Sequence, residues 1–237
     1  MYEINKETRT TTAKEFKVSP EVNNGLAIGI LDNVEVSTFT VKDDAKWIDY
    51  RGKEAVRLSL IFKEVPKEAG VEAGIYIHSY NFIDHSNTDR NKFIAGMFQT
   101  IKHIIGVYKG GVENITDAEY AYLKLDLEDA KNYTAEEIIA AYTKFFNGVK
   151  TVIDGCTTKD IKVWMKLLLY IKGSNVNGGK LGFTSYPGEG LIELYKQDVE
   201  PSLTIRIARQ ESIIPRSDSA PTSPIGDGEI KRPSFLG

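Results

Sequence analysis

The chain contains little cysteine and little histidine, and both shortages exclude classes of protein. Among 237 residues there is one cysteine, Cys156, and three histidines. One cysteine can form neither an intramolecular disulfide nor a zinc site built from thiolates. The histidines do not form an HExxH pattern, which is the common zinc-hydrolase signature. We therefore predict no metal site and no cofactor, and a fold stabilised by burial of apolar side chains.

Long hydrophobic runs are also missing. The longest uninterrupted apolar stretches, such as residues 167–171, have five residues, far fewer than the roughly 20 residues of a membrane-spanning helix. The first residues lack the basic and then apolar order of a signal peptide. We expect a cytoplasmic protein with no membrane partner.

Charge of one sign is not in large excess. Thirty Lys and Arg face 33 Asp and Glu, which gives a net charge of −3 and excludes a uniformly basic nucleic-acid binder. Residues 113–141 are strongly acidic, so the remainder is slightly basic. Because salt screens charges beyond about 8–10 Å, one face of such a chain can still bind a polyanion. The sequence leaves the role of the acidic segment open.

Alternating apolar residues predict three strands in the first third of the chain. Residues 25–41 alternate with a bend at Asp32 and Asn33, residues 56–62 alternate most regularly, and residues 75–82 follow after a turn. A period of two is typical of strands with one buried face.

The period then changes to about 3.6, which predicts helices. One helix begins at Asn87 or Thr88 and ends near residues 110–111, and its apolar positions recur every three or four residues. Thr134 and Glu137 have the spacing of a capping box, which predicts a second helix that ends near residues 154–155. Residues 116–131 fit either a short helix or an acidic loop.

Strand patterns return at residues 162–172 and 203–208, separated by a segment rich in glycine and asparagine. Residues 1–24 have little periodicity, and we expect a flexible N-terminal arm there. Residues 212–237 are rich in serine and proline and poor in apolar residues, which predicts a disordered tail. The predicted domain therefore spans residues 25–211, with a helical insertion at about 88–155.

Three strands, a helical segment and two strands follow one another in the order of an OB-fold. The predicted fold class is α+β, mainly β, an OB-fold-like five-stranded antiparallel barrel with the helical insertion between strands three and four. Another α+β arrangement around an antiparallel sheet is the alternative.

Two segments, VWMKLLLYIKG at 163–173 and GFTSYPGEG at 182–190, together with the strand order and the tail, resemble single-stranded DNA-binding proteins of tailed bacteriophages. The resemblance implies an OB-fold, non-catalytic binding of single-stranded DNA in replication or recombination, and location in the host cytoplasm. It also implies a C-terminal tail that recruits replication proteins. The tip at Phe235 and Leu236 fits such a tail, whereas its equal numbers of acids and bases depart from the usual acidity.

Binding of single strands needs cations for phosphates and aromatic faces for bases. The alternation places such residues on one face of the predicted sheet and in two loops. The predicted nucleic-acid-binding residues are Trp47, Tyr50, Arg51 and Lys53 in the first loop, Arg57, Tyr76 and Tyr80 on strands two and three, Lys162, Trp164, Lys166, Tyr170 and Lys172 on strand four, and Lys180, Phe183 and Tyr186 after it.

Two other functions remain open at this point. A virion or assembly protein would use the same sheet as a scaffold and the helical insertion for subunit contacts. A metal-dependent nuclease would use the carboxylates of Asp126, Glu128 and Asp129. The glycine-rich segment after residue 173 does not match the Walker A pattern, so we predict no catalysis.

Overall fold

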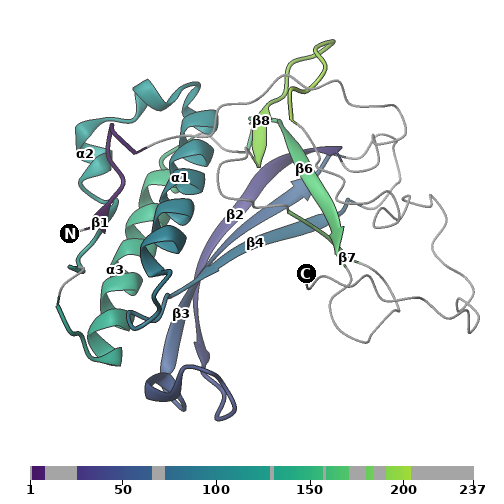
Figure 1. Ribbon diagram of the computed structural model, residues 1–237. Coiled ribbons are helices and arrows are strands. Elements are labelled where there is room, and N and C mark those ends of the chain that lie inside the picture. The colour runs from purple at the N-terminus through teal and green to yellow at the C-terminus, as the bar shows by residue number, and fades with distance from the viewer. Residues whose placement is uncertain are drawn as a thin grey trace, which may run out of the picture.

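The computed structural model describes residues 2–8, 26–65, 73–128, 131–156, 159–170, 180–183 and 191–203, and only the backbone of 167–170 and 180–183. Within these residues the protein is α+β, mainly β: an antiparallel sheet carries two long helices on one of its faces (Figure 1). No described helix has both the length and the apolarity that crossing a membrane requires.

The main sheet has six described strands. Five follow one another in the order β4-β3-β2-β6-β7, and the sixth, β8, pairs with β6 off this path. Their bounds are β2 Leu26–Thr40, β3 Glu54–Glu64, β4 Ile75–Asn81, β6 Val163–Tyr170, β7 Lys180–Phe183 and β8 Ile192–Leu194. All pairs are antiparallel. The long strand β2 pairs with β6 at its beginning and with β3 over most of its length, with a register shift between Leu31 and Asn33. The predicted bend is therefore a β-bulge within the pairing of β2 with β3, and such a bulge bends the strand and increases its twist.

Both predicted long helices are confirmed: α1 spans Arg90–Lys109 and α3 spans Ala135–Asp154. The predicted capping box opens α3, because the Thr134 hydroxyl accepts from the Glu137 N–H at 3.2 Å and the Glu137 carboxylate accepts from the Thr134 N–H at 2.8 Å. Residues 116–131 contain a short helix, α2, and a short strand. The smaller elements are β1 Tyr2–Glu3, η2 Ile48–Tyr50, η3 Val112–Asn114, α2 Asp117–Tyr120 and β5 Lys124–Leu125.

The core lies between the sheet and the two helices. Every second residue of β3, at Leu58, Leu60 and Phe62, is fully buried and faces the helices. Aromatic residues of α3 fill the space above them, including Phe145 and Phe146 at 5.7 Å between ring centroids. We call this the inner face of the sheet and the opposite one the outer face. None of the described helices covers the outer face (Figure 1).

Helix α3 packs very closely on the segment that follows α2, at Gly148. A Cβ atom at this position would lie 2.1 Å from the carbonyl oxygen of Tyr122, which is backbone and cannot move aside cheaply. We expect Gly148→Ala to lower the free energy of unfolding by about 1–3 kcal/mol, although alanine favours helices by about 1 kcal/mol over glycine. Urea unfolding measures the change, with Thr151→Ala on the exposed side of α3 as a control that stays within about 0.5 kcal/mol. A stabilised Gly148→Ala protein would contradict this packing.

The expectation of a flexible arm over residues 1–24 does not hold for residues 2–8, which we call the N-terminal strap. Ile4 is fully buried, and its N–H donates to the Leu123 carbonyl at 2.9 Å. Strand β1 pairs with β5. The ammonium of Lys102 in α1 donates to the carbonyls of residues 5, 6 and 8 at 2.7, 2.8 and 2.7 Å. The strap has no periodic pattern because distant partners, rather than its own sequence, hold it in place.

The predicted antiparallel sheet is present. It is not closed into the predicted five-stranded barrel. Cα atoms of β4 and β7 nevertheless approach within 8 Å. The alternation at 203–208 does not supply the fifth strand of this sheet, which comes from β7. Both β7 and β8 are too short to show an alternating pattern, so the sequence did not indicate them. The remainder of that alternation, residues 204–208, and the predicted tail at 212–237 lie outside the described residues.

Candidate nucleic-acid interface

The register of β2, β3 and β4 defines the outer face row by row. Because the strands are in contact and antiparallel, paired residues point to the same side of the sheet. The four rows that cross all three strands are Ser37, Arg57 and Asn81; Glu35, Ser59 and Ser79; Asn33, Ile61 and Ile77; and Ile30, Lys63 and Ile75. The face therefore changes from polar at one end to apolar at the other.

A cation and an aromatic ring lie together at the polar end. The guanidinium carbon of Arg57 is 4.8 Å from the ring centroid of Phe39, within the range of a cation–π interaction. Arg57 also donates from Nε to Oδ1 of Asn81 at 3.1 Å. The hydroxyls of Ser59 and Ser79 lie 3.0 Å apart in the next row. These contacts hold a partly exposed flat surface that carries a positive charge.

The apolar end is formed by isoleucines of the two outermost strands. Ile75 and Ile77 of β4 are 65% and 57% exposed, and Ile61 is half-buried beside them. Lys63 is exposed in the same row as Ile75. A sheet face with large exposed aliphatic side chains next to cations is suited to a ligand with both apolar and anionic groups.

The loop between β2 and β3 is anchored by the aromatic residues that we predicted as contacts. Tyr50 is buried with its ring 4.6 Å from that of Phe82, and Trp47 is half-buried against the same ring at 5.3 Å. Burial raises the pKa of Tyr50. Tyr50 is therefore a packing residue and not a stacking platform, because its hydrophobic ring closes the loop onto the core.

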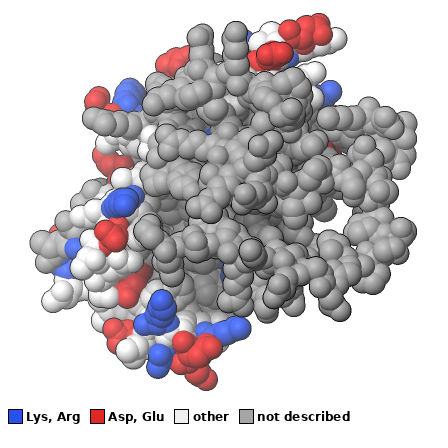
Figure 2. Space-filling model, turned by 45° about the vertical axis from the view of Figure 1, so that its right-hand side comes forward, with Lys and Arg blue, Asp and Glu red and all other residues white. Residues whose placement is uncertain are grey.

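The two predicted cationic contacts in this loop both interact with other residues of the protein. Arg51 is exposed and donates from Nε to the Ala45 carbonyl at 2.9 Å. Lys53 forms an ion pair with Glu136 in the first turn of α3. Arg51 remains available to a phosphate, whereas the charge of Lys53 is balanced by a carboxylate. Over the visible described surface, charges of both signs are interspersed (Figure 2).

The predicted aromatic face of β4 points inward, which corrects the sequence interpretation. Tyr76 is buried and donates to the Glu64 carboxylate at 3.1 Å. The Tyr80 hydroxyl is buried, and this burial raises its pKa. Burial lowers the pKa of His78 to about 4, so its ring is neutral at pH 7. Alternation separates the two faces of a strand, but tyrosine and histidine have polar tips and fit either face, so the pattern alone did not identify the covered one.

Strand β6 has the predicted alternation, with Val163 and Met165 in the core. On its other side Lys162 is exposed, and the half-buried Trp164 lies 5.3 Å from Tyr195 between ring centroids. Lys166, predicted as a phosphate contact, is only 2% exposed and therefore cannot meet a polyanion without rearrangement. The predicted contacts Tyr170, Lys180 and Phe183 fall on strands whose side chains are not described, and Lys172 and Tyr186 lie outside the described residues.

Sequence reasoning missed Phe39 as a site residue. It was counted with the apolar series of residues 34, 36 and 41, which suggests a core position. The available signal was its position in the strand. Phe39 is an odd number of residues from Val34 and from Val36, and a period of two places such residues on opposite faces. The structure brings Phe39 and Arg57 together there.

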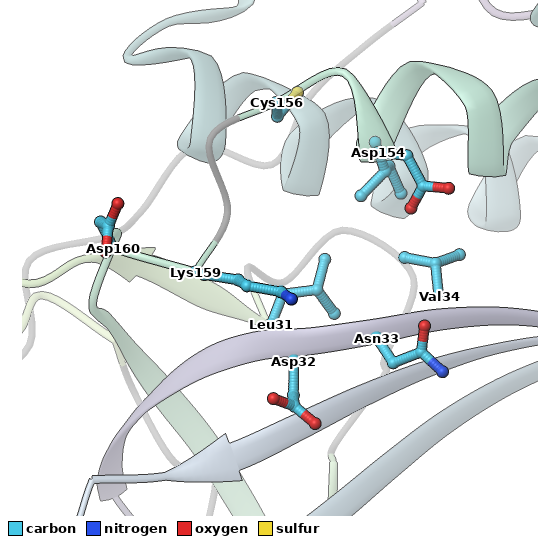
Figure 3. Close-up of a pocket in the computed structure, with 9 residues that line it drawn as sticks. Leu31, Asp32, Asn33, Val34, Asp154, Cys156, Lys159 and Asp160 are labelled. Carbon is cyan, nitrogen blue, oxygen red and sulfur yellow. The ribbon is translucent and has the colours of Figure 1, made fainter.

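A hollow lies beside the bulge of β2 and the end of α3 (Figure 3). Its volume is about 460 Å³, and it is lined by Leu31, Asp32, Asn33, Val34, Ile153, Asp154, Cys156, Lys159 and Asp160. The carboxylates of Asp32, Asp154 and Asp160 point in different directions (Figure 3). Lys150 binds the Val34 carbonyl at 2.8 Å and Asp154 at 2.7 Å. Burial raises the pKa of the Cys156 thiol, which disfavours the nucleophilic thiolate.

Across the described residues, no group of three His, Cys, Asp or Glu side chains is placed to hold a metal ion. Of the acidic residues considered for a nuclease, Asp126 forms an ion pair with Lys144, Glu128 is exposed, and Asp129 lies outside the described residues. The geometry therefore favours the outer face over the hollow as the candidate site. Comparisons with protein-family models, curated proteins and solved structures find no match.

Proposed function

We propose that this protein binds single-stranded DNA on the outer face of β2, β3 and β4, without catalysis, during replication or recombination. The observation that carries the proposal is the pairing of Phe39 with Arg57 on the same sheet face as exposed isoleucines, a face that no described helix covers. Bases can pack on such a surface while phosphates meet the cations around it.

The strand order supports the same proposal, and we propose an OB-fold for the chain. The long bulged strand β2 pairs with β3 and β6, the helices lie between β4 and β6, and β7 approaches β4. OB-folds bind oligonucleotides on the face of their second and third strands, between two flanking loops. These strands correspond to β3 and β4, and one flanking loop corresponds to residues 41–53.

Preference for single strands follows from the shape of this surface. In a duplex the bases are stacked and paired inside, whereas a single strand can turn its bases onto a sheet. Each stacked base contributes roughly 1–3 kcal/mol. Arg57 and Lys63 on the outer face and Arg51 in the loop of residues 41–53 are at least partly exposed and can meet phosphates, and each neutralised phosphate adds to the salt dependence.

A mobility-shift series tests the proposal directly. We expect the full chain to bind a twenty-nucleotide oligo-dT more tightly than a duplex of the same length. The affinity should fall with salt with a log–log slope of about −2, because three cations contribute roughly 0.7 each on single strands. Fluorescence of the half-buried Trp47 and Trp164 gives a second readout. The absence of any oligo-dT binding at low salt would exclude the proposed function.

The alternative function as an assembly protein has one observation in its favour. Exposed isoleucines on β4 are typical of a surface that contacts another protein. A homo-oligomer that dissociates on Ile77→Ser, together with no affinity for oligo-dT, would favour that alternative in light scattering and mobility-shift assays. Recruitment of replication proteins by residues 212–237 and location in a host cytoplasm remain predictions.

A further inference from the structure

We infer that the outer face distinguishes DNA from RNA, and thymine from uracil, through the isoleucine strip formed by Ile61, Ile75 and Ile77. The inference rests on the proposed function and specifies the ligand of that same site. It concerns the apolar end of the outer face, because contacts to phosphates give no role to exposed isoleucines.

The register makes these three side chains neighbours. Ile61 is paired with Ile77 across β3 and β4, and Ile75 is two residues from Ile77 on the same strand. Directly paired residues have Cβ atoms about 4.5–5.5 Å apart, and residues two apart on a strand are separated by about 7 Å. The strip is therefore continuous, and at Ile75 and Ile77 it is more than half exposed.

Two cations lie on the same face as the strip, Lys63 in the row of Ile75 and Arg57 two rows from Ile61, which suits the negative charge of a nucleic acid. Arg57 and Lys63 lie six residues apart on β3, a distance of about 20 Å at 3.3 Å per residue. Ser59 and Ile61 lie between them on the same face. A face with a cation at each end and isoleucines over the half that contains Lys63 fits a ligand that has both phosphates and apolar groups. Glu35 is the single carboxylate in the four rows described above.

Isoleucine side chains can distinguish nucleotides because they neither donate nor accept hydrogen bonds. A ribose 2′-hydroxyl placed on them loses water and gains no hydrogen-bond partner, and this hydroxyl is the group by which proteins tell RNA from DNA. The C5 methyl of thymine, in contrast, gains an apolar contact on such a surface. Burial of one methyl group corresponds to about threefold in affinity for each base in contact.

The test compares twelve-nucleotide oligo-dT, oligo-dU and oligo-rU by fluorescence anisotropy with the full chain. The first two differ by the C5 methyl, and the last two differ by the 2′-hydroxyl. We expect affinity to decrease in the order dT, dU, rU, by about threefold or more at the first step and about tenfold at the second. Oligo-2′-fluoro-U separates sugar pucker from the hydroxyl, since it favours an RNA-like pucker but cannot donate a hydrogen bond.

The double substitution Ile75→Ser and Ile77→Ser assigns the selectivity to the strip. Both side chains are exposed, so we expect the fold to persist and both affinity ratios to fall toward one while binding remains. Phe93→Ser, at a similarly exposed apolar residue in the first turn of α1, should leave both ratios unchanged. A thermal melt verifies folding of each variant.

The outcomes separate the two proposals. If no oligonucleotide binds, the proposed function fails and the inference fails with it. If dT, dU and rU bind with equal affinity, single-strand binding stands and the inference is overturned. If the ratios persist in the double variant, the selectivity lies elsewhere and its assignment to the isoleucine strip is overturned.

Discussion

Replacing Lys102 with methionine is expected to lower the free energy of unfolding by roughly 2–4 kcal/mol, because hydrogen bonds to a charged group contribute about 1.5–3 kcal/mol each and are not additive. Lys102 is 3% exposed, and its three protons meet three strap carbonyls. Methionine retains most of the side-chain volume and donates nothing. The strap carbonyls would then lose their only common partner in the described structure.

Urea unfolding measures this loss, and amide hydrogen exchange locates it. The amide of Ile4 should lose protection in Lys102→Met beyond what the global destabilisation explains, because the strap detaches first. Lys92→Met, at an exposed position near the start of the same helix, is the matched control and should change stability by less than about 0.5 kcal/mol. Unchanged protection at Ile4 in Lys102→Met would show that burial of Ile4, and not the lysine, holds the strap.

Arg57→Glu is expected to reduce affinity for oligo-dT by about 10- to 100-fold at low salt. The substitution removes a cation from the proposed DNA-binding face, ends its contact with the Phe39 ring and adds a negative charge. Arg57→Gln removes the charge but can still donate to Asn81, so its loss should be smaller. The difference between the two variants measures repulsion of phosphate rather than local unfolding.

Glu35→Gln is the opposite control on the same face. Removing the carboxylate in the row next to Arg57 should raise affinity by about two- to fivefold, the usual size for an exposed charge. Lys53→Ala, whose ammonium is paired with Glu136, should have little effect. Affinities are compared in mobility shifts, with circular dichroism as the folding check. Equal affinity of Arg57→Glu and the unmodified protein would place any DNA site elsewhere.

The sequence predicted the elements well because their signals are local. A period of two located β2, β3, β4 and β6, and the capping box at Thr134 located the start of α3. Even the bulge near Asn33 was indicated, since it interrupts an alternation that continues on both sides. Each of these patterns depends only on residues that are close in the sequence, within about one or two helical turns or one strand.

The residues of the candidate site were predicted less well, because they depend on which face of the sheet is covered. Tyr76 and Ile77 are adjacent, and the structure buries the tyrosine and exposes the isoleucine, the reverse of the choice that polarity suggests. The tyrosine is buried because its hydroxyl has a partner in Glu64 on the neighbouring strand. Lys102 and the N-terminal strap are a second example, since residues that meet across nearly a hundred positions leave no local pattern.

The bulged strand β2 also has a consequence for the order of assembly during synthesis. Most of its length pairs with β3, which follows directly, whereas Leu26–Gly29 pairs with Val163–Lys166, more than half the chain later. Pairings between distant segments form slowly because closing the intervening loop is entropically costly. The β2–β3–β4 meander can therefore emerge from the ribosome before its neighbour exists, with one backbone edge of β2 unsatisfied. Chaperone binding at that stage would protect this edge until β6 arrives.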